Sequence, residues 1–256
     1  MPSLYDRADI YDLIESESRY QMFKAHWENI LNGRDIKTLL DVSIGSGSAT
    51  LQLAELGVRL SGSDLSKEML ANCRKKAAAR NLEVELKCCD FRKVAEHFTG
   101  PFDCVASTGN SLPYVSNEDV LYTLGQMDAL VKPGGYLYFE IRNWDLILQQ
   151  RERFFPYAPF FDGDTRINLT QVWDYHLDGS ITFNILYVFE KDGRFMQKEV
   201  FEEHYHPIKR ELLLIKLREL GYSKIAVMAY LSQFANMKVD NAPWYCVLAE
   251  KSEGKI

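Results

Sequence analysis

The sequence predicts an α/β fold: a mostly parallel sheet with helices on both faces and an antiparallel β-meander cap inserted before the last helix. Three observations support this fold class. Short apolar runs alternate with helical segments between Thr38 and Arg142. From Thr165 onward, hydrophobic and polar residues alternate every two positions instead. After Pro207 a helical segment and two further apolar runs return, so the meander interrupts the α/β part of the chain.

The first predicted element is an amphipathic helix near the N-terminus. Its apolar residues recur at the spacing of one helical face, and they are Tyr20, Phe23, Trp27, Ile30 and Leu31. The Asn32-Gly33 pair that follows supplies a helix stop.

The next segments predict the strands and helices of the sheet. The strands are expected in "TLLDVSI", "VRLSGSD", "VELKCCD", "FDCVAST" and "YLYFEI". Helices are expected between them at about 49–56, 67–80 and 119–130. Strands that alternate with helices are typical of a parallel sheet covered on both faces.

The rest of the chain completes this arrangement. Asp178-Gly179 and Asp192-Gly193 fall between alternating runs and predict hairpin turns. Pro207 opens a predicted helix that Gly221 ends, and "KIAVMAY" and "WYCVLAE" are the last expected strands. The predicted division is an N-terminal segment (1–34), a core (35–164), a cap insert (165–206) and the C-terminal part of the core (207–256).

Composition narrows the functional classes. The formal net charge is −6 and the isoelectric point is near 5.5, whereas a nucleic-acid-binding surface needs a basic face. No apolar run is long enough to span a bilayer, so we expect a cytoplasmic protein with a small-molecule substrate, no nucleic-acid or membrane partner, and a possible homo-oligomer. The five cysteines lack zinc-type spacing and are expected to be reduced, buried thiols.

The candidate site lies where the predicted strands end. In a parallel sheet, ligands bind beyond the carboxyl ends of the strands, so the residues that follow each strand are the informative ones. They are Gly45 and Gly47 after the first strand, Asp64 after the second, Asp90-Phe91 after the third, Gly109-Asn110 after the fourth and Arg142-Asn143 after the fifth.

These residue types favour a nucleoside ligand. Glycines let backbone approach a ligand closely, and a carboxylate nineteen positions after Gly45 suits the hydroxyls of a ribose. The dinucleotide fingerprint requires a third glycine where this chain has Thr50. A nucleoside without a pyrophosphate is therefore favoured.

With these motifs the sequence resembles the class I S-adenosylmethionine (SAM)-dependent methyltransferases, and among them the glycine and glycine/sarcosine N-methyltransferases. The similarity rests on "LLDVSIGSGSATLQLAELG", "GSDLSKEML", "DCVASTGNSLPYV" and "LVKPGGYLYFEIRNWDLIL". It implies a Rossmann-like core, SAM as the cofactor and a small carboxylated amine, glycine or sarcosine, as the acceptor.

The resemblance also assigns residues to the cofactor. It places Gly45 and Gly47 against the methionine and ribose portion of SAM, with Asp64 on the ribose hydroxyls and Asp90 at the adenine amine. Leu65 and Phe91 accompany these two carboxylates. Arg19 matches the arginine that pairs with the SAM carboxylate, Tyr11 matches a tyrosine near the sulfonium, and the segment that carries both is expected to act as a lid.

For the acceptor, the resemblance matches Asn110 and Arg142 to the residues that hold glycine, and Tyr187 and Tyr205 of the meander to positions over the substrate. The sequence departs from the family at Phe23, which replaces a tyrosine, and at His206, which replaces an aromatic hydroxyl. An arginine where a buried strand ends is costly to desolvate unless an anion meets it, and a substrate carboxylate is such an anion.

Several of these residues also have a simpler structural interpretation. Arg142 can be a surface residue in an ion pair, Tyr187 a packing residue, and Asp64 a helix cap. Glu202, Glu203, His204 and His206 suggest a metal cluster, but they lack a distant third ligand, so no metal is expected. A nicotinamide-dependent dehydrogenase, a SAM-dependent methyltransferase for another small molecule and a non-catalytic SAM-binding protein are the alternative functions.

Overall fold

The computed structural model describes residues 3–253. Residues 1–2 and 254–256, which belong to the predicted N-terminal segment and C-terminal part, lie outside the described residues.

The core is a seven-stranded sheet in the order β11-β12-β5-β4-β1-β2-β3. Its strands are β1 (Thr38–Asp41), β2 (Arg59–Asp64), β3 (Val84–Cys88), β4 (Phe102–Ser107), β5 (Val131–Arg142), β11 (Tyr222–Ala229) and β12 (Trp244–Lys251). The first five pair in parallel, and β12 runs antiparallel to both β5 and β11. The mostly parallel sheet is confirmed, and the carboxyl ends of β1, β2, β4 and β5 meet at one edge.

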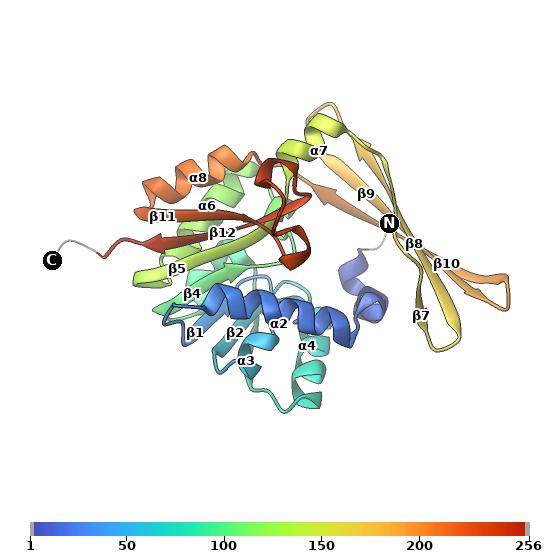
Figure 1. The fold of residues 1–256 in the computed structure, drawn as a ribbon, viewed down its shortest axis with the longest axis horizontal. Helices are drawn as coiled ribbons and strands as arrows, with labels where there is room; N and C mark the ends of the chain where they lie inside the picture. The colour runs from blue at the N-terminus through green and yellow to red at the C-terminus, as the bar shows by residue number, and fades with distance from the viewer. Residues whose placement is uncertain (1–2, 254–256) are drawn as a thin grey trace.

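Helices cover both faces of this sheet (Figure 1). One face carries α2 (Glu17–Leu31), α3 (Gln52–Glu55) and α4 (Lys67–Ala79), and the other carries α6 (Asn117–Asp128) and α8 (Arg210–Glu219). The shorter helices are α1 (Ala8–Tyr11), α5 (Val94–His97) and α7 (Trp144–Gln150). The predicted helix at 49–56 is a single helical turn preceded by turn structure, and α8 begins at Arg210 rather than at Pro207.

The buried side chains form two apolar clusters, one on each face of the sheet. Along β5, Leu137, Phe139 and Ile141 join the cluster under α6 and α8, whereas Tyr138 joins the one under α2 and α4. This is the alternation that a strand buried on both faces requires. The same alternation continues to Arg142, the last residue of β5, and fixes the face of the sheet from which its side chain leaves.

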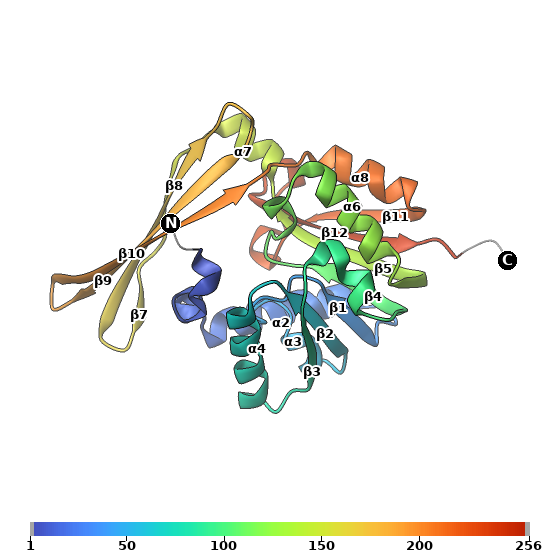
Figure 2. The same cartoon turned by 180° about the vertical axis from the view of Figure 1, so that it is seen from behind.

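The cap is a second, antiparallel sheet that projects from one side of the core (Figure 2). Its strands are β6 (Phe154–Pro156), β7 (Phe160–Asp162), β8 (Thr165–Tyr175), β9 (Ile181–Lys191) and β10 (Arg194–Tyr205). Both predicted hairpin turns are confirmed, since Asp178-Gly179 joins β8 to β9 and Asp192-Gly193 joins β9 to β10. The alternation did not reveal β6 and β7, which have three residues each and lie before Thr165.

The N-terminal segment lies between the core and the cap (Figures 1 and 2). Its 3₁₀ helices are η1 (Leu4–Asp6) and η2 (Asp12–Ile14), and the others in the chain are η3 (Phe91–Lys93), η4 (Leu112–Tyr114), η5 (Ser232–Phe234) and η6 (Val239–Asn241). Asp12 fastens the segment to the core by accepting hydrogen bonds from Ser46 Oγ at 2.7 Å and Lys76 Nζ at 3.1 Å. Glu203 of β10 fastens it to the cap by accepting from Ser3 Oγ at 2.8 Å and the Leu4 N–H at 2.7 Å.

The five cysteines are free thiols. Cys88 is exposed, contrary to the expectation that all are buried, because β3 is the edge strand of the sheet. No helix within residues 3–253 combines the length and the apolar character that a membrane span requires.

Candidate active site

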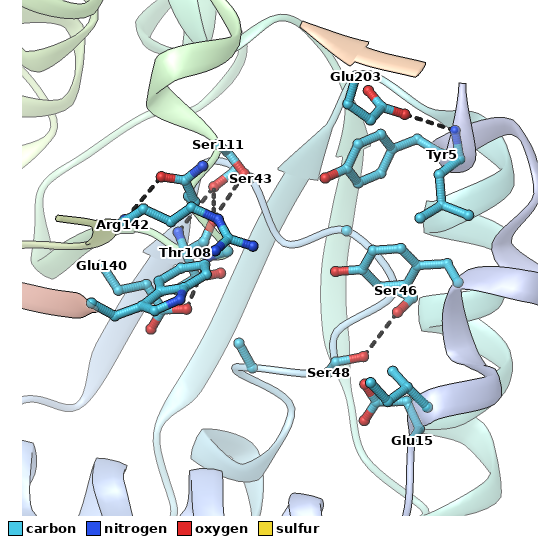
Figure 3. A pocket seen from close by; sticks show the side chains of 18 of the residues that line it. Tyr5, Glu15, Ser43, Ser46, Ser48, Thr108, Ser111, Glu140, Arg142 and Glu203 are labelled. Atoms are coloured by element: carbon cyan, nitrogen blue, oxygen red, sulfur yellow. Dashed lines mark hydrogen bonds between the residues drawn. The ribbon is translucent and has the colours of Figure 1, made fainter. Parts of the chain in front are cut away.

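A cavity of about 440 Å³ opens at the carboxyl ends of the parallel strands, beneath the cap and beside the N-terminal segment (Figure 3). This volume is typical of a site for one small-molecule ligand together with a cofactor fragment or substrate. Eight of the twelve predicted site residues line it: Tyr11, Arg19, Gly45, Asp64, Asn110, Arg142, Tyr187 and Tyr205. The structure brings these residues together from the N-terminal segment, four strand ends and the cap.

The other four predicted residues lie outside this lining. Gly47 has a φ of +81°, and a side chain there would meet Leu51 and Cys73, so this glycine serves the packing behind the cavity. Leu65 is 71% exposed. Asp90 caps η3, and the Arg92 guanidinium at 3.0 Å holds the pKa of its carboxyl below the usual range. Phe91 begins the same short helix, and the cofactor contacts of all four stay predictions.

Asp64 organises the glycine-turn half of the cavity. Its Oδ2 accepts the Gly45 N–H at 3.0 Å and its Oδ1 accepts the Ser66 N–H at 2.8 Å. Gly45 has a φ of +55°, which favours glycine. Burial raises the pKa of Asp64, and the backbone donors oppose that shift. Each carboxylate oxygen keeps a second lone pair, so the residues fit a ribose that donates two hydroxyls here.

Arg19 and Tyr11 enter the cavity from the N-terminal side. The Arg19 Nε lies 3.4 Å from Glu15 Oε1, and its guanidinium lies 5.1 Å from the centre of the Phe23 ring. Burial raises the pKa of Tyr11 and keeps its hydroxyl neutral. A cation and a neutral hydroxyl at this side of the cavity fit the carboxylate and the sulfonium end of SAM.

Arg142 lies on the opposite side of the cavity among aromatic rings. Its guanidinium carbon is 4.7 Å from the centre of the Trp244 ring, 5.1 Å from that of Trp173 and 5.3 Å from that of Phe183. Within the described part of the chain, no carboxylate forms an ion pair with it. The interpretation of Arg142 as a surface ion-pair residue is therefore wrong, and a half-buried cation is left facing the cavity.

Asn110 is fixed beside Arg142. It has a φ of +61° and is 1% exposed, and its Oδ1 accepts the backbone N–H of Arg142 at 2.9 Å. Its buried Nδ2 has no hydrogen-bond partner in residues 3–253. Leaving a buried amide donor unpaired is unfavourable, which indicates that a ligand oxygen belongs next to it.

Glu140 is a cavity residue that the motifs did not identify. It precedes Arg142 by two positions on β5, so the two side chains leave the same face. Its Oε1 accepts the Gly109 N–H at 2.9 Å, its Oε2 accepts from Tyr138 Oη at 3.2 Å, and burial raises its pKa to about 7. A lone carboxylate inside an apolar strand was the available sequence signal.

Tyr187 and Tyr205 close the cavity from the cap. Both are buried, and burial raises the pKa of Tyr205 to about 12 although the Arg142 charge acts against the shift. Tyr5, Tyr114 and Glu203 lie next to Tyr205 and were not predicted as site residues; Figure 3 shows Tyr5 and Glu203 on the side of the cavity facing Arg142. Only the tertiary fold brings these three together, because they come from η1, η4 and β10.

Asn143, which follows Arg142, has a structural role. Asn143 is 1% exposed, and its Nδ2 donates to the carbonyls of Val239 and Ala242, both at 3.0 Å, so its side chain holds the η6 loop. No group of three or more histidine, cysteine, aspartate or glutamate side chains in the described range is arranged to hold a metal ion.

Comparisons with known proteins show similarity to methyltransferases. Residues 39–135 match the family model of a methyltransferase domain. The chain is 26% identical over 216 residues to a glycine/sarcosine N-methyltransferase of Aphanothece halophytica, covering 84% of this chain and 76% of that protein. It is 25% identical over 243 residues to a glycine/sarcosine/dimethylglycine N-methyltransferase of Actinopolyspora halophila, covering 94% of this chain but only 40% of that protein.

A solved structure shares the whole architecture. The S-adenosylmethionine-dependent methyltransferase from Clostridium acetobutylicum superposes with a TM-score of 0.76 at 19% identity, covering 96% of this chain and 97% of that one. At this identity the likeness concerns the fold, including the antiparallel cap.

Proposed function

We propose that this chain, a class I SAM-dependent methyltransferase with SAM as its cofactor, methylates the nitrogen of a small carboxylated amine, most directly glycine or sarcosine. The part of the cavity around Arg142 and Asn110 is here called the acceptor half. The observation that carries the proposal is the pair of donors without partners in this half. The Arg142 guanidinium has no carboxylate partner in residues 3–253, and the buried Asn110 Nδ2 has no acceptor there. Two donors without partners, on residues that are joined by a hydrogen bond, suit one carboxylate.

The surroundings of Arg142 favour tight binding of a carboxylate in one orientation. A guanidinium binds a carboxylate through two parallel N–H donors, and its flat faces stack on aromatic rings. The rings of Trp173, Phe183 and Trp244 lie within cation–π distance of the guanidinium and supply an apolar surrounding for it. In a water-poor cavity, the attraction between this cation and a carboxylate is stronger than it is at the protein surface.

When bound, SAM supplies a methyl group on a positively charged sulfur, which an amine lone pair can attack. The work of this chain is to bind and orient. Arg142 and Asn110 hold the carboxylate end of the acceptor, while Asp64 and the Gly45 turn hold the nucleoside half of the site. Tyr187 and Tyr205 cover the space between the two halves and keep water from it.

The names of two relatives support the acceptor assignment, since both are glycine/sarcosine-type N-methyltransferases. The test is turnover of glycine, sarcosine and methylamine with SAM, followed as S-adenosylhomocysteine formation. We expect glycine or sarcosine to be methylated and methylamine, which lacks the carboxylate, to be a very poor acceptor. Equal turnover of methylamine and glycine would contradict the proposal, and SAM binding without turnover of any amine would favour a non-catalytic SAM-binding protein.

A further inference from the structure

Three tyrosine hydroxyls meet at the edge of the acceptor half. The Tyr114 hydroxyl donates to Tyr5 Oη at 2.9 Å and shares a short hydrogen bond with the Tyr205 hydroxyl. Burial raises the pKa of each of the three phenols, so all are neutral and each carries one proton. A chain of neutral hydroxyls can pass a proton along without any of them becoming charged.

The chain of hydroxyls leads to a carboxylate. Glu203 is 5% exposed, and Tyr114 interacts with its carboxylate in addition to the hydrogen bonds with Tyr5 and Tyr205. Burial raises the pKa of Glu203, which makes it a better proton acceptor than an exposed glutamate. The relay requires the Tyr114 O–H bond to rotate from Tyr5 toward Glu203.

The other end of the chain lies beside the proposed substrate anchor. Tyr205 packs on Phe183 with ring centres 4.5 Å apart, and Arg142 lies over the same Phe183 ring. The Arg142 charge also acts on the Tyr205 hydroxyl. The relay requires that an amine whose carboxylate is held by Arg142 places its nitrogen next to this hydroxyl.

The other carboxylates of the cavity lie outside the cluster of Tyr5, Tyr114 and Tyr205. Glu15 lies in an ion pair with Arg19, and Asp64 holds two backbone N–H groups at the glycine turn. Glu140 holds the Gly109 N–H and accepts from Tyr138. Among the described residues that line the cavity, Glu203 is the carboxylate that interacts with the cluster of Tyr5, Tyr114 and Tyr205.

We propose that Glu203 accepts, through Tyr205 and Tyr114, the proton that the substrate ammonium must lose before its nitrogen can attack. This inference rests on the proposed amine acceptor. The Tyr205 oxygen takes the ammonium proton as Tyr205 passes its own proton to Tyr114, and Tyr114 passes its own proton to a carboxylate oxygen of Glu203. The result is a free amine, two neutral phenols and a neutral Glu203, which returns the proton to solvent after product leaves. One proton is thus released for each methyl group transferred.

The charged and titratable groups around this path set its pH dependence. Glu203 faces Tyr5 and the Leu4 N–H of η1 and Tyr114 of η4, and His204 follows it on its own strand. His204 lowers the pKa of Glu203 slightly, and Arg142 acts in the same direction on Tyr205. None of the three phenols replaces Glu203 as a base at neutral pH, since burial raises the pKa of each of them.

The test compares Glu203→Gln and Tyr114→Phe with the wild type over a range of pH. We expect kcat to fall about 100-fold at pH 7, the usual contribution of an acid–base group, while SAM affinity and the KM of the amine change less than about twofold. The loss should shrink as pH rises to where the free amine predominates in solution, because the amine then arrives without the extra proton. A purely structural role of Glu203 would give a loss that is the same at every pH.

Glu199→Gln is the matched control. Glu199 lies four residues earlier on the same face of β10 and also faces the N-terminal segment, with Arg7 at 3.7 Å. It lies outside the cavity lining, and its cross-strand partner on β9 is Tyr187. Its removal should leave the pH profile unchanged. A wild-type-like profile for Glu203→Gln, or a pH-dependent loss in Glu140→Gln instead, would overturn the relay.

The two proposals fail in different ways. If the wild type methylates an amine other than glycine or sarcosine, the proposed substrate is wrong and the relay is measured with that amine. If the wild type methylates glycine and the Glu203 variant does so equally well at neutral pH, the relay alone is wrong. An acceptor without an amine overturns both.

Discussion

The backbone N–H of Arg142 donates a 2.9 Å hydrogen bond to Oδ1 of Asn110, so the last residue of β5 fixes the side chain at the turn after β4. The bond orients the asparagine amide, whose buried Nδ2 has no hydrogen-bond partner in residues 3–253. The two groups are thus preorganised, and a carboxylate that enters does not have to order them.

Replacing Arg142 with leucine should cost about 2 to 5 kcal/mol in kcat/KM for glycine, or roughly 30-fold to several thousand-fold, because the substrate carboxylate would be buried without a partner. SAM affinity should barely change, and methylamine should be as poor an acceptor for the variant as for the wild type. Lysine should rescue little, since a point charge lacks the planar fork. Steady-state kinetics with glycine, sarcosine and methylamine measures these effects. Undiminished glycine turnover in Arg142→Leu would contradict the assignment of Arg142 to the substrate carboxylate.

Replacing Asp64 with alanine should weaken SAM binding by about 1.5 to 3 kcal/mol, because hydrogen bonds to a charged acceptor are lost and the Gly45 turn loses its support. Calorimetry of SAM binding to the folded variant measures the change. The same titration of Asp90→Ala tests the predicted adenine contact. An unchanged affinity there would leave Asp90 as the cap of η3 and the partner of Arg92.

Binding of SAM should slow hydrogen exchange in residues 5–24, because Tyr11 and Arg19 in this segment line the cavity. Asp12→Ala should speed exchange in the same residues before SAM is added, since Asp12 joins the segment to Ser46 and Lys76. Exchange followed by mass spectrometry reports both effects. Protection that does not respond to SAM would show that the segment is no lid.

Glu140 should make the folded state less stable as pH rises. Burial raises its pKa from 4.5 to about 7, so between these values the folded state holds a proton that the unfolded state has released. This contribution is complete below pH 4.5 and is lost as pH passes 7. Relative to the wild type, Glu140→Gln should gain stability between pH 5 and pH 8, by at most about 3 kcal/mol. Urea unfolding at both pH values measures the difference, and a pH-independent difference would contradict the assignment.

Asn143→Ala should destabilise the fold by about 1 to 3 kcal/mol, because its Nδ2 holds buried carbonyls of the η6 loop. Asn110→Ala should leave stability closer to that of the wild type while it weakens acceptor binding, since Asn110 makes a single protein hydrogen bond with its Oδ1. Thermal unfolding and acceptor KM, measured on both variants, separate the two roles. The reverse pattern would mean that Asn143 is the ligand residue.

The sequence predicted the sheet, its helices and the meander well, because each depends on local periodicity and on turn residues such as Asp178-Gly179. It also located Gly45, Asp64, Asn110 and Arg142, since the end of a parallel strand is a position that the chain order defines. It could not distinguish Asn143 from Asn110, because the difference lies in which distant carbonyls are within reach. The Tyr5, Tyr114 and Glu203 cluster was missed for a similar reason: its members are distant in sequence and meet only when the cap folds over the N-terminal segment.

The side chains of β8 and β9 alternate between the cavity side and the outer side of the cap sheet, and this has an evolutionary consequence. Their inward side chains, among them Leu169, Gln171, Phe183 and Ile185, form the wall of the acceptor half, whereas the glycine turn and Asp64 belong to the other sheet. Substitutions along one face of these two hairpin strands can therefore resize the acceptor space without touching the nucleoside contacts. A lineage that carries this cap can diverge in its choice of acceptor by point mutation alone while every descendant retains the same methyl donor.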